Sequence, residues 1–265
     1  MRTPQHRRAF TLVETLVTMA IITLLLAIIV PSLRSLQEAS RSASCSANLR
    51  QMFTAAESYA MHHQETLPAA IIYRLRPEGL ATIAWDFEHD ALGNVKPGPM
   101  WSFTDDPSQT MQCPSFLGAS TFGNDPATGY NYNTTYLGAE GRFPELGADG
   151  RWVDGWANAR RGVPPSQHRR PAETAMFGDA GWVGGANKFM RAPSGNVEND
   201  LSVVYSGGQA FRHSGCCNVV HLDGHVCACT MACEGEHASQ PLLDQLLGYP
   251  LNGFLSDDDR AYDPR

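Results

Sequence analysis

Residues 10–33 read FTLVETLVTMAIITLLLAIIVPSL, and this stretch decides the fold. The nineteen residues from Thr15 to Leu33 carry no charge. As a helix they would span roughly 28 Å at about 1.5 Å per residue, close to the thickness of a bilayer hydrocarbon core. We therefore expect a helix that crosses a membrane.

The charges on either side of the apolar run predict its orientation. Arg2, Arg7 and Arg8 precede the run, whereas Arg34 and Arg41 follow it. Because cytoplasmic flanks carry the excess of basic residues, the N-terminus is expected in the cytoplasm. The rest of the chain would then be exported.

An acid inside the apolar run argues against an ordinary anchor or signal peptide. Glu14 lies five residues after Ala9, and an unpaired carboxylate at hydrocarbon depth costs about 2.5–3.5 kcal/mol on insertion scales. A secretory signal peptide would place a small-residue cleavage site directly after the run, which here ends AIIVP. We expect Glu14 to have a partner.

Residues 9–14 (AFTLVE) resemble the cleavage and methylation motif of type IV prepilins and type II secretion pseudopilins. The resemblance implies that a prepilin peptidase/methyltransferase cuts between Ala9 and Phe10 and methylates the new amine of Phe10. Glu14 would then pair with the terminal amine of a neighbouring subunit, and Pro31 would kink the helix. The family more often has Gly before the cut, so Ala9 is a departure. The alternative is a single-pass anchor with a chance glutamate.

The helical pattern continues beyond Pro31 to about His63, before Leu67-Pro68. From Phe10 to His63 such a helix would extend about 80 Å, far beyond a globular domain. The first half must therefore pack on lipid or on neighbouring stems, and the second half on the chain's own head. The predicted apolar stripe of the second half consists of Leu33, Leu36, Ala39, Ala43, Ala47, Met52, Ala56 and Tyr59 or Ala60.

The composition of the whole chain limits its class. The 265 residues are 43% hydrophobic and 18% charged, with a mean hydropathy of −0.26, which excludes a disordered chain and a polytopic membrane protein. The net charge of −7 argues against binding of nucleic acid.

Beyond residue 67, Gly, Pro, Asn and Thr favour short strands and turns. The predicted class is α+β and pilin-like, with a long N-terminal helix packed on an antiparallel sheet. The predicted parts are a leader (1–9), a transmembrane and stem helix (10–66) and the head (67–265). The expected strands are Ala70 to Tyr73, Tyr130 to Leu137, Thr174 to Phe177 and Leu201 to Tyr205, with a loop or insertion between Phe143 and Arg170.

Residues 216–229 read CCNVVHLDGHVCAC, in which Asp223-Gly224 is a strong hairpin signal. A two-residue turn would place His225 on the face of Leu222 and would put His221 on the other face. His213, nine residues and then Asp223-Gly224 resemble the processing-associated H-X9-DG pattern of bacterial prepilin-like proteins. Cys45, Asn48-Leu49, Gln51, Tyr59 and Leu67-Pro68 resemble the stem signature of the same group.

Three roles stay open for this motif. The structural role makes Asp-Gly a turn and His213 a packing or hydrogen-bonding residue. A zinc-type site would use His213, His221, Asp223 or His225 with nearby thiolates. Catalysis is the third, although no nucleophile with a base is apparent.

Export permits disulfides, and six head cysteines have 15 pairing schemes, with Cys45 left over. These six are Cys113, Cys216, Cys217, Cys227, Cys229 and Cys233. The acidic run Asp257-Asp258-Asp259 invites a calcium interpretation but lacks the spacing of a calcium loop.

Together these features predict a non-enzymatic prepilin or pseudopilin with no catalytic residue, metal or cofactor. Its partners would be the prepilin peptidase/methyltransferase, other pilin or pseudopilin subunits and the bacterial inner membrane. It would be anchored there by one span, with the head in the periplasm, and would later join a filament at the cell surface. The alternatives are an exported binding or adhesion module on a pilin-like stem and an exported metalloprotein.

Overall fold

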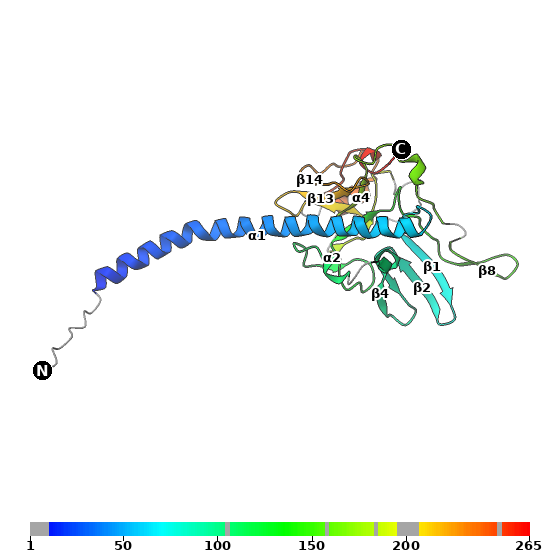
Figure 1. The fold of residues 1–265 in the computed structure, drawn as a ribbon, viewed down its shortest axis with the longest axis horizontal. Helices are drawn as coiled ribbons and strands as arrows, with labels where there is room; N and C mark the ends of the chain where they lie inside the picture. Colours follow the sequence, from blue (N-terminus) through cyan, green and yellow to red (C-terminus); the bar gives the residue numbers. More distant parts are fainter. Residues whose placement is uncertain (1–10, 104–106, 157–158, 183–184, 195–206, 248–250) are drawn as a thin grey trace. The chain divides into compact units, whose positions relative to one another are not determined.

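The computed structural model describes residues 11–103, 107–156, 159–182, 185–194, 207–247 and 251–265. A long N-terminal helix is followed by a region rich in antiparallel strands, so the predicted α+β layout is confirmed (Figure 1). The chain divides into one unit up to Ser40 and a second from Arg41 to Arg265, and each is described by itself.

Helix α1 spans Leu12–His62. It continues through Pro31 without interruption. Its end lies one residue before the predicted position, and Gln64 and Glu65 then adopt positive φ values of 55° and 60°. Since the left-handed region is incompatible with a continuing α-helix, these two residues terminate α1.

The part of α1 in the first unit has the properties of a membrane span. It contains an 18-residue window with a mean hydropathy of 2.6, none of which is buried. Leu24, for example, is 64% exposed. Since burying one such side chain is worth about 1.5–3 kcal/mol, this surface would be strongly stabilised by a lipid or protein cover.

The part of α1 in the second unit packs on the head along one stripe. The buried row is Cys45, Leu49, Met52, Ala56 and Ala60, at steps of three and four residues. The predicted stripe was partly wrong, because Ala43 and Ala47 are exposed. The prediction included the small residues Ala43 and Ala47, whereas the residues that are buried recur with the helical period from Cys45.

Two sheets form the framework of the described head. The smaller is the antiparallel meander β1-β2-β3-β4. The larger has the order β11-β6-β9-β12-β15, with the hairpin β13–β14 paired to β9. The strands of the first sheet are β1 (Ile71–Arg76), β2 (Gly79–Ala84), β3 (Phe87–His89) and β4 (Val95–Pro97). Those of the second are β6 (Tyr130–Asn133), β9 (Ala175–Gly181), β11 (Phe189–Met190), β12 (Gly208–Ala210), β13 (Cys217–His221), β14 (Val226–Cys229) and β15 (Asn252–Gly253).

Short elements connect and flank these sheets. The helical ones are η1 (Pro99–Phe103), α2 (Ser108–Met111), η2 (Pro165–Gln167), α4 (Gln240–Leu247) and η4 (Asp259–Ala261). The minor strands form two pairs, β5 (Ala119–Ser120) with β10 (Gly185–Ala186) and β7 (Glu145–Leu146) with β8 (Trp152–Val153). The segment predicted as a loop between Phe143 and Arg170 therefore contains one small hairpin.

Three of the predicted strands correspond to β1, β6 and β9, and the fourth, 201–205, lies outside the described residues. Strand β6 is shorter than predicted. It ends at Asn133, whose side-chain oxygen accepts a hydrogen bond from the Tyr136 backbone N–H at 3.2 Å. This side-chain bond holds the Tyr136 N–H in a local turn, so the backbone leaves the sheet after Asn133.

Strand β9 is the central element of the larger sheet and is buried throughout. Strand β6 pairs along one of its edges, and β12 and β13 share the other. The chain leaves this second edge after β12 and returns to it at β13. The segment between these two strands contains His213.

Candidate functional site

The N-terminal motif begins outside the described residues, since Ala9 and Phe10 belong to the undescribed stretch 1–10. The next residues form a capping box. The Thr11 backbone N–H and hydroxyl donate to Glu14 Oε2 at 2.7 and 2.8 Å, and the Glu14 backbone N–H donates to Thr11 Oγ1 at 3.3 Å. This role of Glu14 was not predicted, although T-x-x-E is the recognised signal of a capping box.

His213 is placed beside β9 by a tight turn. The backbones of His213 and Cys216 exchange two hydrogen bonds of 3.0 Å, and Ser214 and Gly215 between them have φ values of 54° and 86°. Two successive residues with positive φ are typical of a two-residue turn that matches the twist of a hairpin. The turn brings the imidazole to Asp179 on β9, with His213 Nε2 3.4 Å from Asp179 Oδ2.

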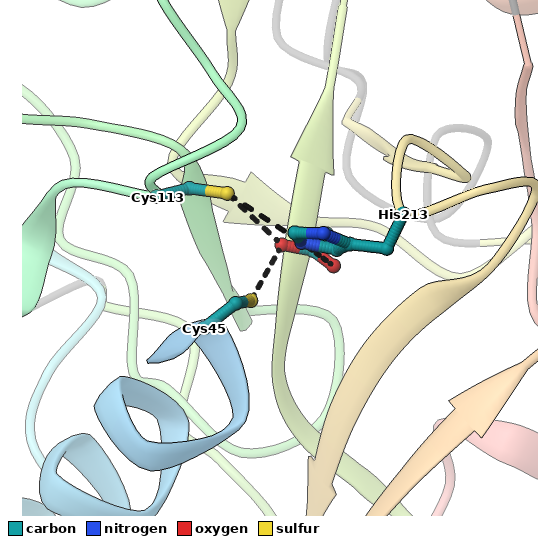
Figure 2. Close-up of side chains that lie close together, drawn as sticks. Cys45, Cys113 and His213 are labelled. Carbon is teal, nitrogen blue, oxygen red and sulfur yellow. Dashed lines mark hydrogen bonds and ion pairs between the residues drawn. The ribbon is translucent and has the colours of Figure 1, made fainter. Parts of the chain in front are cut away.

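Two cysteines from distant parts of the chain complete this group. Cys45 comes from α1, and Cys113 lies on the loop after α2. Figure 2 shows the labelled side chains of Cys45, Cys113 and His213 pointing toward one another. We call Cys45, Cys113, Asp179 and His213 the buried cluster, and their side chains are sealed from solvent.

The distances within the buried cluster are short. Cys45 Sγ and Cys113 Sγ donate to Asp179 Oδ1 at 3.2 and 3.6 Å, and Cys113 Sγ lies 3.7 Å from His213 Nε2. The Asn218 backbone N–H donates to Asp179 Oδ2 at 2.8 Å. The carboxylate of Asp179 is therefore the centre of the cluster and is fixed in place by β13.

The cluster strongly shifts the pKa values of its members. The hydrogen bond with Cys45, followed by that with His213, lowers the pKa of Cys113 to about 6, whereas the pKa of Cys45 is raised. Burial lowers the pKa of His213, but the hydrogen bonds and charges of Asp179 and Cys113 outweigh it and raise this pKa to about 10. The cluster therefore favours proton loss at Cys113 and proton binding at His213, where water is excluded.

The loop of the hairpin that carries the DG motif is one residue longer than expected. Cys217 pairs with Cys229 and Val220 with Val226, and the His221 backbone N–H donates to the His225 carbonyl at 3.0 Å. The loop therefore has three residues, and the third, Gly224, has a φ of 84°. A three-residue hairpin loop with its last residue in the left-handed region is a common alternative to the two-residue turn.

This shift corrects the predicted faces, because a slip of one residue moves side chains to the opposite side. His221 and His225 share a face and stack, with ring centroids 4.3 Å apart and planes at 2°. Cys227 Sγ lies 4.0 Å from His221 Nδ1. The prediction that strand alternation separates the two histidines was wrong.

Asp223 and Gly224 have separate structural roles at the turn. Asp223 Oδ1 accepts from the His225 backbone N–H at 3.1 Å and lies 2.6 Å from His225 Nδ1. Gly224 lies against α1, since a Cβ there would come within 2.7 Å of the Phe53 ring. These contacts agree with the structural role that the sequence analysis left open for Asp-Gly.

All seven cysteines are free thiols in the structure. Cys113 lies beside Cys45, which the sequence analysis had left over, and not with the hairpin cysteines. Cys227 Sγ and Cys229 Sγ lie 3.4 Å apart, well beyond a disulfide bond of about 2.05 Å. The disulfide pairing of Cys216, Cys217 and Cys233 stays a prediction.

The acidic run at 257–259 has internal partners. Asp259 accepts hydrogen bonds from the hydroxyls of Tyr136 and Ser194, and Asp258 accepts from the Arg260 backbone N–H at 3.1 Å. These carboxylates brace the C-terminal segment and cap η4. Within the described residues, groups with metal-ligand geometry lie elsewhere, in the buried cluster and at His221, His225 and Cys227.

Comparison with known proteins supports the N-terminal motif. Residues 4–30 match the family model of the prokaryotic N-terminal methylation motif. No curated protein and no solved structure matches the chain. The motif supports a type IV pilin-like protein in general, with a hydrophobic N-terminal helix of the inner-membrane-anchored kind.

Proposed function

We propose that the chain is a structural, non-enzymatic subunit of a type II secretion pseudopilus or type IV pilus-like filament. It would be anchored with its N-terminus in the cytoplasm, cut between Ala9 and Phe10 and methylated on Phe10. The supporting observation is the exposed apolar half of α1 directly behind the methylation motif. Lipid would cover this half before assembly, and neighbouring helices afterwards.

Glu14 is the residue on which assembly would depend. In the single chain its carboxylate is held by Thr11 within the capping box. In a filament the same carboxylate would bind the methylated amine of Phe10 from a neighbouring subunit. Such a buried pair sets register more than it adds stability, because desolvation offsets much of the attraction.

The first experiment tests processing. The chain is produced in cells with an active prepilin peptidase, and its intact mass and N-terminal sequence are measured. We expect a mature chain that begins at N-methylated Phe10. A leader 1–9 that stays attached would refute processing and would favour the anchored binding module.

The second experiment tests assembly through the Glu14→Gln variant. Glutamine is equally suited to a capping box, so this change removes the charge and keeps the helix start. Glu38→Gln is the matched control, because it makes the same change on α1 outside the apolar run. We expect loss of sedimentable filaments and of stem crosslinks for Glu14→Gln only. Equal assembly of both variants would contradict the role of Glu14.

A further inference from the structure

We propose that Cys45, Cys113, Asp179 and His213 bind one divalent metal ion of the zinc type in a closed structural site. The inference is independent of filament assembly. Each of the four side chains offers one ligand atom, and these atoms lie within 4.8 Å of one another. They come from α1, from the loop after α2, from β9 and from the turn before β13.

Several distances between the ligand atoms are close to those of a tetrahedral site. With zinc bonds of about 2.0–2.3 Å, neighbouring ligand atoms in a tetrahedral site lie about 3.3–3.8 Å apart. Asp179 Oδ1 lies 3.2 Å from Cys45 Sγ and 3.6 Å from Cys113 Sγ, and the other carboxylate oxygen, Oδ2, lies 3.4 Å from His213 Nε2. Cys113 Sγ and His213 Nε2 are 3.7 Å apart. With one ligand atom from each residue, all separations stay within 4.8 Å, so the four side chains can close around one ion.

The donor set selects the class of metal. Two sulfurs, one imidazole and one carboxylate suit zinc and related borderline ions, whereas calcium and magnesium require oxygen ligands. Four protein ligands complete the coordination of zinc, and the buried side chains exclude water. The site would therefore be structural and not catalytic.

The surroundings already orient the ligands. The Asn218 backbone N–H fixes Asp179 Oδ2 at 2.8 Å, and the Ser214-Gly215 turn fixes the position of His213. Partners outside the ligand shell are typical of metal sites and are needed to align the donors. A loose group of thiols would not require this support.

The site also explains the spacing between His213 and the DG turn. His213 meets α1 at Cys45, and Gly224 meets α1 at Phe53. These two positions on α1 are separated by about 12 Å at 1.5 Å per residue. Strand β13 spans this distance, so the hairpin is attached to the stem helix at both ends. The metal would clamp one end and the turn would pack against the other.

The hairpin group His221, His225 and Cys227 is a weaker candidate. It offers three ligands, two imidazoles and one thiol, and the side chain of His225 is 46% exposed and bonded to Asp223. It serves as the internal control for the buried cluster.

The test uses the full chain in detergent, purified without chelator under reducing conditions, with zinc supplied during growth. We expect one zinc per chain by elemental analysis. After exchange for cobalt(II), we expect the visible absorption of a tetrahedral ion and a thiolate charge-transfer band. A folded chain that binds no metal when titrated with zinc would overturn the proposal, as would a Cys45–Cys113 disulfide found by mass in the native protein.

Variants locate the ion. Cys113→Ser and His213→Gln should lose the zinc, whereas the double variant His225→Gln, Cys227→Ser should retain both the zinc and the cobalt spectrum. The double variant changes partly exposed positions, so it stays informative even where the buried substitutions prevent folding. Loss of metal from the double variant, or its retention by folded Cys113→Ser, would overturn the assignment.

Discussion

Replacement of Lys188 by methionine should strongly destabilise the head. The ammonium of Lys188 lies 2.6 Å from Asp86 Oδ1 and 2.8 Å from Asp125 Oδ2, and all three side chains are at most 2% exposed. One cation is therefore shared by two buried carboxylates. Lys188→Met keeps most of the side-chain volume and removes this shared partner.

The expected loss follows from the burial of both acids. Removal of one partner from a buried ion pair costs about 3–5 kcal/mol, because a charge is left without compensation. His89 Nε2 lies 2.7 Å from Asp125 Oδ1 and continues to bond that acid. Within the described residues, Asp86 forms no ion pair with a second cationic side chain. We therefore expect a loss of at least about 3 kcal/mol.

Urea unfolding of the full chain in detergent measures the effect. Trp85 is a local reporter, since it is buried and its indole N–H donates to the Lys188 carbonyl at 3.2 Å. With a urea slope of about 2–3 kcal/mol per M, the midpoint should fall by about 1–2 M.

A surface pair provides the control for this experiment. Lys96 is 63% exposed and lies 3.3 Å from Glu88, so Lys96→Met should cost less than about 1 kcal/mol. A Lys188→Met variant that unfolds within 1 kcal/mol of the wild type would refute the reasoning. Equal losses of stability in Lys188→Met and Lys96→Met would also refute it.

Three further changes and one control variant test the head by the same unfolding assay. Burial raises the pKa of Asp86 to about 6 from 3.8, so the wild-type free energy of unfolding should fall as pH rises from about 4 to about 6. Asp86→Asn should abolish this pH dependence. An unchanged pH profile in the variant would show that Asp86 does not cause it. Gly224→Ala should cost about 2–4 kcal/mol, from its positive φ and its contact with Phe53. Gly150→Ala is the control. An added Cβ there meets open space, so only the positive φ lowers the stability, by about 1–2 kcal/mol. Asn133→Ala should cost about 2–4 kcal/mol, because two buried carbonyls lose their donor; a loss under 1 kcal/mol would show that water replaces it.

Local sequence signals predicted the length of the stem helix well, and they predicted poorly which faces of the stem and of the hairpin are buried. The end of α1 was placed within one residue, since helix length and a following Leu-Pro are read from adjacent residues. The apolar stripe and the DG turn were each misplaced. In both cases a choice between neighbouring registers depended on contacts with the rest of the fold, at Cys45 and at Gly224.

The sequence by itself determined that the chain has an exposed apolar helix behind a methylation motif, because hydropathy and helical rise are properties of consecutive residues. Only the tertiary structure brought Cys45 and Asp179, 134 positions apart, into hydrogen-bonding distance. No pattern of consecutive residues indicates that these two side chains are neighbours. It arises because β9 is central, the stem helix packs on it, and the chain turns at His213 between two strands on its edge.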